Sequence, residues 1–492
     1  MTDNINPTLI WLRRDLRLRD HLPLTKAVES GAPIIPVYIL DRTSPEIEKP
    51  GAASLWWLHH SLSALQKAYR EKGIKLILRR GPAVEVLGEL CKETEAGALF
   101  FQRSILPGEE ALEQNIADFC ERNEIDFRRF RGETLYDPGE IRTGSDTPYK
   151  VFTPFWKSCL EEPEPGEPLP IPRTIPAAKN DPESDKLEDW ELLPKRPNWA
   201  KSFENLWQPG KEGAGEEGAG EVGARRSLAR FLNSHVSDYK KMRDYPAVDG
   251  TSRLSPHLHY GEISIRDCWH QTKAEHVADK GAEAFLRELG WREFCYHLLH
   301  HWPEMEEQPF RPEYAAYPWA KNKAQLEAWQ KGKTGFPIID AAMRQLWQTG
   351  WMHNRLRMLV GSFLVKNLMI HWHEGRDWFW DTLVDADIAN NSAGWQWIAG
   401  SGADAAPYFR IFNPVTQSER FDKEGEFIRR YVPELKDLPA KHIHAPYDAP
   451  KEILEKAGVR LGKTYPKPIV DLKTTRQAAL DGYEKVKANK DD

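Results

Sequence analysis

The stretch PIIPVYIL at residues 33–40, followed by ASLWWLHHSLSALQKAYREKG at 53–73, decides the fold of the first part of the chain. The first segment is a short apolar run of the kind that forms a buried strand. The second places leucine at 55, 58, 62 and 65, and this spacing of three and four predicts an amphipathic helix. A strand followed by such a helix indicates a right-handed crossover and therefore a parallel sheet.

The same alternation extends on both sides of this stretch. Further strand-like runs are TLIWL (8–12), IKLILR (74–79), ALFFQ (98–102) and IDFRRF (125–130), and helical patterns lie at 22–29, 83–93 and 109–123. We therefore expect an α/β domain over residues 1–135. No GxGxxG follows the first strand, so the sequence does not support a dinucleotide ligand for this domain.

The amino-acid composition of the chain changes after this domain. Residues 136–223 are dense in Pro, Glu and Gly, which predicts an extended interdomain connector. From residue 224 onward the apolar periodicity is almost wholly helical. Helices are predicted at 226–239, 284–301, 323–332, 338–350 and 351–370. We expect a second, all-α domain over 224–492, which ends in a charged, proline-punctuated peripheral tail.

The composition excludes several classes of protein. No run of 18 apolar residues exists and the N-terminus lacks the pattern of a secretory signal, so we expect a cytoplasmic protein without a membrane span. The five cysteines are far apart and include no CxxC pair, which argues against a disulfide framework or a structural zinc site. The net charge of -6 means that DNA binding would need a local basic patch.

Two short motifs could bind a ligand, and each also has a plainer explanation. In TSRLS (251–255), hydroxyls surround an arginine at a turn into a helix; this fits a phosphate cradle, but a Ser/Thr helix cap explains the motif better when it is taken alone. In ELGWREF (288–294), Glu288, Trp291 and Arg292 share one helix face. They could grip a heterocyclic base, or equally form a core tryptophan beside a surface ion pair.

Two further motifs lie later in the chain. In GWMHNRLRM (350–358), Asn354 and Met358 stand one helical turn apart between arginines, which fits a pocket with a phosphate rim or a buried helix with a basic, solvated side. In DADIANNSAGWQW (385–397), Asp385 and Asp387 precede a short predicted helix. The remaining oxygen ligands of a calcium loop are absent, so a polar cofactor fits better than a metal ion, and no metal is predicted.

Taken together and in this order, these segments resemble the DNA photolyase and cryptochrome family over nearly the whole chain. The matching blocks are WLRRDLRLRDHLPL (11–24), YKVFTPFWK (149–157), TSRLS, ELGWREF, GKTGFPIIDAAMRQLWQTGWMHNRLRM (332–358) and DADIANNSAGWQW through APYFRIFNP (385–414). The resemblance is strongest to the bacterial branch that repairs cyclobutane pyrimidine dimers. It implies a Rossmann-like α/β domain that holds an antenna chromophore, and a helical catalytic domain that binds FAD.

The resemblance also implies which residues bind FAD. The predicted cofactor-binding residues are Tyr239, Thr251, Ser252, Arg253, Leu254 and Ser255 at the phosphates and ribityl chain, and Asp385, Ala386, Asp387 and Asn391 at the flavin and ribose. Asn391 would lie against flavin N5, where plant-type cryptochromes typically carry aspartate. An amide supplies a proton less readily than a carboxylic acid, so Asn391 favours the fully reduced, anionic flavin that repair needs.

The implied partner is ultraviolet-damaged DNA, with the dimer flipped out of the duplex. The predicted catalytic residues are Glu288, Trp291, Asn354, Met358, Asn391 and Trp397, and the predicted DNA contacts are Arg243, Arg292, Arg355, Arg357 and Gln417. Relatives that repair the (6-4) photoproduct carry paired histidines where this chain has Met352, His353 and Asn354, with asparagine at the pocket position, which favours the cyclobutane dimer. The alternative function is a cryptochrome-type blue-light photoreceptor without repair activity.

Two further expectations follow from the resemblance. Trp395, Trp372 and Trp319 match the chain of three tryptophans that passes electrons from the surface to oxidised flavin. The blocks GAASLWWLHHSL (51–62) and NWAKSFENLWQPG (198–210) are similar to a branch that uses methenyltetrahydrofolate as antenna, so we expect this chromophore, although other members bind a deazaflavin, a flavin or none. We expect a monomer that associates with the nucleoid during repair, with no membrane and no obligate protein partner.

Overall fold

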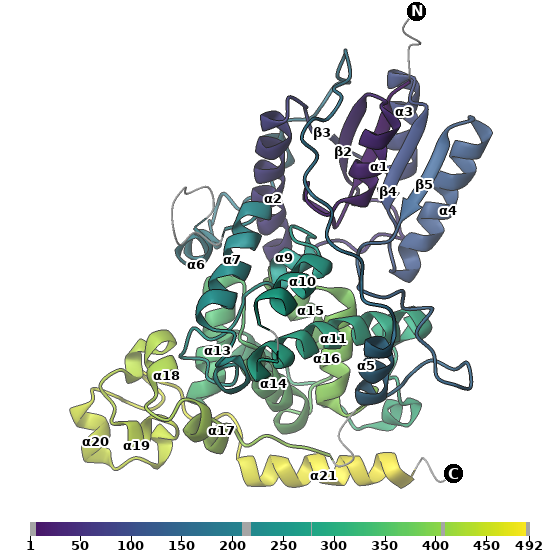
Figure 1. Ribbon diagram of the computed structural model, residues 1–492. Coiled ribbons are helices and arrows are strands. Elements are labelled where there is room, and N and C mark those ends of the chain that lie inside the picture. Colours follow the sequence, from purple (N-terminus) through teal and green to yellow (C-terminus); the bar gives the residue numbers. More distant parts are fainter. Residues whose placement is uncertain (1–5, 209–217, 277, 405–408, 489–492) are drawn as a thin grey trace, which may run out of the picture. The chain divides into compact units, whose positions relative to one another are not determined.

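The computed structural model describes residues 6–208, 218–276, 278–404 and 409–488 (Figure 1). The chain divides into two compact units. The first comprises Met1–Ser237 and Ser252–Pro303, and the second comprises Asp238–Thr251 and Glu304–Asp492. Within the described residues, no helix is long and apolar enough to cross a membrane. The predicted domain limits at residues 135 and 223 remain predictions.

A five-stranded parallel sheet forms the centre of the first unit. Its strands are β1 (Thr8–Leu12), β2 (Ile34–Leu40), β3 (Ile77–Arg80), β4 (Ala98–Gln102) and β5 (Asp126–Phe130), in the order β3-β2-β1-β4-β5. Thr8 pairs with Ile34 on one side and with Ala98 on the other, so β1 is the central strand. The structure therefore confirms the predicted parallel α/β sheet, with each strand close to its apolar run.

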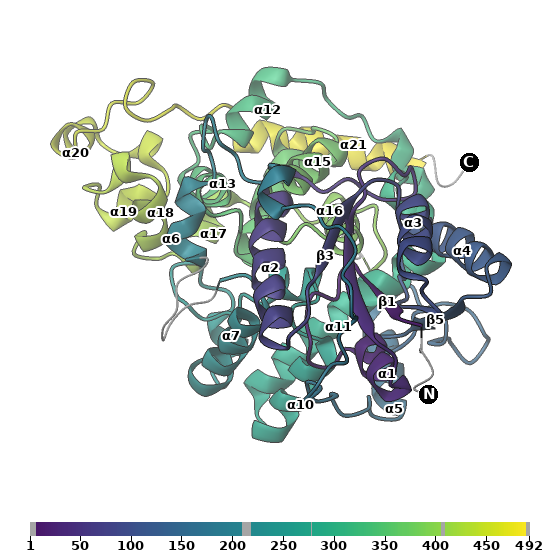
Figure 2. The ribbon, with the colours of Figure 1, turned by 90° about the horizontal axis from the view of Figure 1, so that it is seen from above.

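Helices cover this sheet. The helices that follow β1 to β4 in turn are α1 (Leu22–Ser30), α2 (Ala52–Glu71), α3 (Ala83–Thr94) and α4 (Pro107–Arg122). Helices α3 and α4 lie side by side (Figure 2) and pack on Leu9, Trp11, Leu99 and Phe101. All five residues of β1 are buried, and successive side chains of a strand point to opposite faces, so both faces are covered.

The motif WLRRD closes the carboxyl end of the sheet with a buried ionic network. Arg13 Nη1 donates to Glu109 at 3.0 Å, and Arg14 Nε donates to Glu133 at 3.0 Å. Burial alone would raise the pKa of Glu109, but the Arg14 and Arg13 guanidinium groups outweigh it and lower the pKa to about 2. The carboxylate is therefore ionised in the folded protein, and this part of the motif fixes the loop after β1.

The remainder of the first unit combines irregular chain with helices. Between residues 131 and 220, the described elements are α5 (Phe152–Glu161), η1 (Leu187–Trp190), η2 (Lys201–Phe203) and α6 (Glu204–Trp207), as the Pro-rich composition indicated. Residues 209–217, which contain most of the glycine-rich run, lie outside the described part. The helices that follow are α7 (Glu221–Ser234), α9 (Ser255–His259), α10 (Ile265–Glu275) and α11 (Lys280–His301).

The second unit is helical, as predicted. Its helices are α8 (Tyr239–Met242), α12 (Lys323–Gln330), α13 (Pro337–Thr349), α14 (Asn354–Ser362), α15 (Trp372–Thr382), α16 (Ile388–Ala399), α17 (Pro414–Phe421), α18 (Glu426–Tyr431), α19 (Ala440–Ile443), α20 (Lys451–Lys456) and α21 (Leu472–Ala488). Short 3-10 turns are η3 (Pro303–Glu306), η4 (Pro312–Ala316), η6 (Pro433–Leu435) and η7 (Pro446–Asp448). Its core includes Trp329, Leu356, Phe363, Trp372 and Trp395, which come from α12 to α16.

The predicted helix at 351–370 is wrong in its extent. Helix α14 begins only at Asn354, where the Nδ1 atom of His353 caps it by accepting the Arg355 N–H at 3.2 Å. After Ser362 the chain forms a π-helical turn, η5 (Phe363–Asn367), in which the Leu368 N–H donates to the Phe363 carbonyl at 3.0 Å. A π turn inserts an extra residue, so it changes which side chains face the core, and apolar spacing cannot reveal it.

Candidate functional site

An ion pair in the second unit joins two residues that the sequence assigned to different partners. Arg357, in α14, was predicted to contact DNA, and Asp385, in the loop before α16, was predicted to face the flavin. Arg357 Nη2 donates to both Asp385 oxygens, at 3.0 and 2.7 Å, and its Nε donates to the Met352 carbonyl at 2.8 Å. The Asp385 side chain is 2% exposed. The Arg357 guanidinium therefore binds and holds the buried Asp385 carboxylate.

The other polar residues of this loop are fixed by helix ends. Asp387 caps α16, because its Oδ1 accepts the backbone N–H of Asn390 at 2.8 Å and the side-chain amide of Asn390 at 2.6 Å. Asn391 Nδ2 donates to the Arg376 carbonyl of α15 at 3.1 Å. Ala386 is buried between the two acids. Among the described residues, no group of three or more His, Cys, Asp or Glu could hold a metal ion.

Buried polar atoms near these residues suit a bound polar group. Burial lowers the pKa of His353 to about 4, so the ring is neutral, and its Nδ1 already accepts a backbone N–H. The proton therefore lies on Nε2, which is buried without a partner among the described residues. The Oγ of Ser392 and the Nε1 of Trp395, both on α16, are likewise buried without a hydrogen-bond partner among the described residues. Buried polar groups usually have partners, so α14 and α16 fit a polar cofactor such as FAD.

The predicted lesion residues of the second unit lie on α14 as expected. Asn354 is exposed at the start of the helix, and Met358 is half-buried one turn later. Between them, Arg355 Nη2 forms an ion pair with Asp244 at 2.6 Å, and its guanidinium lies 4.6 Å from the ring centre of Phe421. This arginine is thus held in place by both a carboxylate and an aromatic ring.

The remaining predicted DNA contacts of the second unit lie on or beside short helices. Arg243, directly after α8, is half-buried with its guanidinium 5.4 Å from the ring centre of Tyr239, a buried residue that was predicted to bind FAD. Gln417 is half-buried in α17. Both side chains therefore reach the surface of the second unit in part.

In the first unit, Glu288, Trp291 and Arg292 lie on α11 at the predicted spacing. Trp291 is half-buried and stacks on Phe152 of α5, with ring centres 3.8 Å apart and planes 8° from parallel. Arg292 Nη1 donates to the Glu133 carbonyl at 2.8 Å. Trp291 is therefore not a fully buried core residue. Arg292 forms its hydrogen bond to a backbone carbonyl of the same unit.

The TSRLS segment does not form the simple helix cap that its composition favoured. Helix α9 begins at Ser255, and its N-cap residue is Leu254, which makes no side-chain capping bond. The Oγ of Ser252 instead accepts the Leu254 N–H at 3.4 Å, and Arg253 has a left-handed backbone with φ of 52°. Thr251 is half-buried and is the last residue of Asp238–Thr251, a segment that belongs to the second unit. The Ser/Thr-cap explanation is therefore wrong.

The three predicted electron-transfer tryptophans lie in the second unit and differ in burial. Trp395 and Trp372 are 4% and 1% exposed, whereas Trp319 is only half-buried. The Trp395 ring lies against Gly375 of α15 so closely that a Cβ there would meet it at 2.1 Å. His371 lies between the other two rings, 4.9 Å from Trp319 and 5.7 Å from Trp372. Trp319 is thus the one of the three that reaches the surface in part.

Trp397 lies near the end of α16 and lines a hollow in the second unit. The other lining residues are Tyr314, Lys366, Ile398, Gly400, Phe409, Arg410 and Phe412. Of the APYFRIFNP block, Ala406, Pro407 and Tyr408 lie outside the described residues. The hollow therefore combines an aromatic lining with the two cations Lys366 and Arg410.

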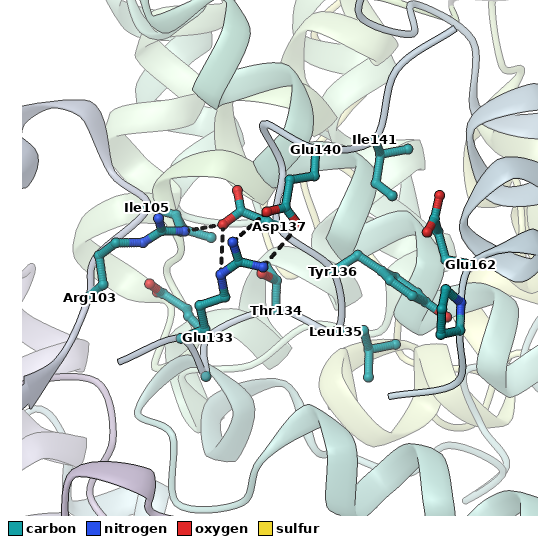
Figure 3. A pocket seen from close by; sticks show the side chains of 13 residues that line it. Arg103, Ile105, Glu133, Thr134, Leu135, Tyr136, Asp137, Glu140, Ile141 and Glu162 are labelled. Atoms are coloured by element: carbon teal, nitrogen blue, oxygen red, sulfur yellow. Dashed lines mark hydrogen bonds and ion pairs between the residues drawn. The ribbon is translucent and has the colours of Figure 1, made fainter. Parts of the chain in front are cut away.

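A second hollow lies in the first unit, where β4 and β5 end (Figure 3). Arg103 follows β4 and forms an ion pair with Asp137, while Arg131 follows β5 and binds Glu140, with Nη1 donating at 2.9 Å. The remaining acids of the lining are Glu133 and Glu162. Four carboxylates against two guanidinium groups make this hollow acidic, so it is a poor site for an anion.

Several residues of the site carry signals that the sequence reasoning did not use. Lys366 interrupts the most apolar segment of the chain, and this interruption marks a buried lysine that lines the hollow. Phe152, the partner of Trp291, belongs to the block YKVFTPFWK. Asp244 and Arg376, by contrast, contact the site through an ion pair and a backbone carbonyl, and no local pattern predicts either contact.

Comparison with known proteins agrees with this geometry. Residues 8–174 match the family described as DNA photolyase, and residues 285–485 match the FAD binding domain of DNA photolyase. The chain is 46% identical to the deoxyribodipyrimidine photo-lyase of Agrobacterium fabrum, over 98% of both chains, and 39% identical to that of Escherichia coli, over 98% of this chain and 99% of the relative.

A solved structure is similarly close. The crystal structure of a bacterial class III photolyase from Agrobacterium tumefaciens superposes with a TM-score of 0.94 at 46% identity, covering 99% of both chains. The matches span both units, and they include the segment that holds Arg357, Asp385 and Asn391. The chain therefore belongs to the DNA photolyase family.

Proposed function

We propose that the protein is a deoxyribodipyrimidine photolyase, which uses light to split cyclobutane pyrimidine dimers in DNA. Its similarity to enzymes of this activity extends over the full chain. The structural observation that carries the proposal is the Arg357–Asp385 ion pair, because it ties α14, which bears Asn354 and Met358, to the loop that precedes Asn391. One ion pair thus connects the helix of the proposed lesion residues to the loop of the proposed flavin residues.

FAD fits the residues of α14, α16 and the loop between α15 and α16. When bound and fully reduced, FAD supplies on absorbing blue light the electron that splits the dimer, and it recovers that electron afterwards. Asp385 and Asp387 would hold the flavin and ribose side, and Arg357 orients Asp385 through their ion pair. The Asn391 amide, held by the Arg376 carbonyl, presents no acidic proton to the flavin. The Tyr239 and Thr251–Ser255 segments would hold the phosphates.

In the second unit, the proposed lesion contacts are Trp397, Asn354 and Met358. In the first unit, the proposed lesion contacts are Glu288 and Trp291 on α11. Aromatic rings give a flipped, unstacked base pair a surface to stack on, and the amide and carboxylate read its polar edges.

Arg243, Arg355 and Gln417 are the proposed contacts to the DNA backbone. Arg292 and Arg357, which were also predicted to contact DNA, donate to a backbone carbonyl and to a buried carboxylate, so we propose that they support the site as well. Because its substrate is the chromosome, we place the protein in the cytoplasm, where it would act as a monomer.

The antenna is proposed to be methenyltetrahydrofolate, bound by the first unit. The two sequence blocks that suggest folate are in contact. Trp56 of α2 lies 5.3 Å from Phe203, and Trp57 lies 4.9 Å from Trp207, measured between ring centres. These four buried rings pack on one another and so join the two blocks. Extracted chromophores should contain folate, and Trp56→Ala should lower its content, whereas Tyr136→Phe in the acidic hollow should not. Loss of folate only in Tyr136→Phe would indicate that the antenna binds in the acidic hollow and not beside Trp56.

A direct assay tests repair against the photoreceptor alternative. The reduced protein is mixed with an oligonucleotide that contains one thymine dimer and is irradiated with blue light. Repair restores the ultraviolet absorbance of the two thymines, and a dark sample is the control. A photoreceptor would bind FAD and respond to light without restoring that absorbance, and such a result would refute the proposed activity.

A further inference from the structure

Lys366 is a buried lysine in the π-helical turn η5. Its side chain is nearly inaccessible, with a residue exposure of 2%. Nζ donates to the carbonyl of Ala399, the last residue of α16, at 2.5 Å, and it lies 3.1 Å from the ring centre of Phe409. Burial lowers the pKa of Lys366 well below its ordinary value, which shows how costly the charge is at this place. Because burying an ammonium group is costly, an apolar side chain would be favoured at this position if Lys366 had no role.

The end of α16 is held by two cations together. Lys366 binds the carbonyl of Ala399, and Arg311 Nη1 donates to the carbonyl of Gly400 at 3.3 Å. The last carbonyls of a helix lack intrahelical partners and carry partial negative charge, so both contacts are favourable. Gly400 itself has φ of 89°, and its N–H donates back to the Gln396 carbonyl at 2.9 Å. The direction in which the chain leaves α16 is therefore fixed.

The π turn explains how a lysine on this segment reaches α16. With one extra residue in the turn, Lys366 faces the end of α16, while Phe363 and Leu364 remain in the apolar core. Lys366 is also on the segment that continues from α14, the helix of Asn354 and Met358. A single side chain thus connects that helix to the end of the helix that bears Trp397.

The surroundings of Gly400 leave little freedom. A Cβ at this position would lie 3.1 Å from the Tyr314 hydroxyl and 3.5 Å from Lys366 Nζ. Trp397, Phe409 and Lys366 line the same hollow, and Arg410 is exposed beside it. Because Lys366 is buried, it cannot itself reach a DNA phosphate. Its effect must pass through the residues that it holds.

We propose that Lys366 is a positioning residue for lesion binding, which holds the end of α16 and Phe409 so that Trp397 is preorganised for the flipped dimer. This inference rests on the proposed repair function and names a residue outside the set predicted to touch substrate. A preorganised ring loses less conformational freedom when the lesion docks, so the contribution is to affinity and not to the electron-transfer step.

The test separates affinity from repair. Dissociation constants for dimer-containing and undamaged oligonucleotides are measured in the dark by fluorescence anisotropy, and repair per absorbed photon is measured at saturating DNA. Lys366→Met keeps the length of the side chain but removes the cation. We expect affinity for the dimer to fall roughly tenfold, as for the loss of one charged hydrogen bond. Repair per photon at saturation should stay at the wild-type value, and Lys366→Arg should restore most of the affinity.

A matched control is Lys331→Met, because Lys331 is an exposed lysine of the same unit that pairs with Glu327. It should behave as the wild type. Unchanged dimer affinity in a folded Lys366→Met protein, an equal fall in repair per photon, or no rescue by Lys366→Arg would each overturn the inference. A wild-type protein that repairs no dimer would instead refute the proposed function.

If Lys366→Met does not fold, Phe409→Leu decides the question. This variant removes the ring that faces the ammonium group but keeps an apolar side chain. Several-fold weaker binding to the dimer, with an unchanged flavin spectrum, would support the positioning role. Wild-type affinity in Phe409→Leu would overturn it, because the lysine would then hold nothing that the lesion needs.

Discussion

The guanidinium of Arg357 and the carboxylate of Asp385 form a bidentate contact through one nitrogen, at 3.0 and 2.7 Å. The carboxylate is buried, whereas the arginine is 26% exposed. The pair therefore lies at the border between the interior of the second unit and its surface. This position suits a residue pair that must hold a cofactor while it supports a substrate-binding helix.

Removing either partner of this pair should release the cofactor. Arg357→Met leaves a buried carboxylate without its cation, so we expect loss of bound FAD and a fall of about 3 kcal/mol in the free energy of unfolding. Asp385→Asn should also lose FAD, and the double variant should be more stable than Arg357→Met alone. Flavin-to-protein ratios and denaturant titrations measure both effects.

The matched control for this prediction is Arg344→Met. Arg344 forms a similar partly buried ion pair with Glu434 at 2.9 Å in the same unit. Its loss should lower stability and leave the flavin content unchanged. Equal loss of FAD from Arg344→Met and Arg357→Met would mean that the effect is one of general stability.

Asn391→Asp should change which redox state of the flavin is favoured. The Asn391 amide donates to the Arg376 carbonyl, and an ionised aspartate would instead place two acceptors against each other. The new carboxyl group therefore keeps its proton and becomes a proton source at the flavin. We expect redox titration to show stabilisation of the one-electron-reduced flavin and a lower repair yield. Asn391→Ser, which adds no acid, should not show this stabilisation.

Replacing Trp395, Trp372 or Trp319 by phenylalanine should slow the photoreduction of oxidised flavin. Phenylalanine keeps the packing but is much harder to oxidise than indole. Repair by protein that has been reduced chemically beforehand should be unaffected, because the proposed role of these residues is to return an electron to the flavin and not to touch the dimer. Transient absorption measures the first effect and the dimer assay measures the second. Trp269→Phe, a buried tryptophan of the first unit, is the control and should photoreduce normally.

The sheet was predictable from sequence because its strands are buried on both faces and therefore appear as continuous apolar runs. PIIPVYIL and ALFFQ show this most clearly, and β2 and β4 match them within one residue. The π turn at Phe363–Asn367 was not predictable, because an apolar segment gives the same pattern for an α-helix and for a π-helical turn. For this reason the sequence shows Lys366 only as a polar interruption of an apolar segment and does not predict its contact with the Ala399 carbonyl.

The site was predictable where its residues are close in sequence. Asn354 and Met358, or Glu288 and Trp291, lie on one helix, so their spacing alone predicts that they share a face. Arg357 illustrates the limit. Its sequence position among other arginines suggested DNA, but its partner is Asp385, 28 residues later. A pairing over that distance depends on how α14 packs against the loop before α16.

Glu293 makes the stability of the first unit depend on pH. The side chain follows Arg292 in α11, is buried, and accepts the backbone N–H groups of Leu135 and Tyr136 at 2.9 and 3.2 Å through Oε2. Its Oε1 has no hydrogen-bond partner among the described residues. Burial raises the pKa of Glu293 to about 7, although Arg292 and the two backbone donors act in the opposite direction.

Glu293→Gln should therefore remove a loss of stability at neutral and alkaline pH. Because the pKa in the folded state lies above that of the unfolded chain, the folded protein binds the extra proton, and stability falls as pH rises from about 4.5 to about 7. Glutamine still accepts both backbone N–H groups and never ionises. We expect equal thermal midpoints for variant and wild type near pH 5, and a variant more stable by about 3 kcal/mol at pH 8. A difference that is constant across this range would contradict the raised pKa, because it would then reflect packing and not titration.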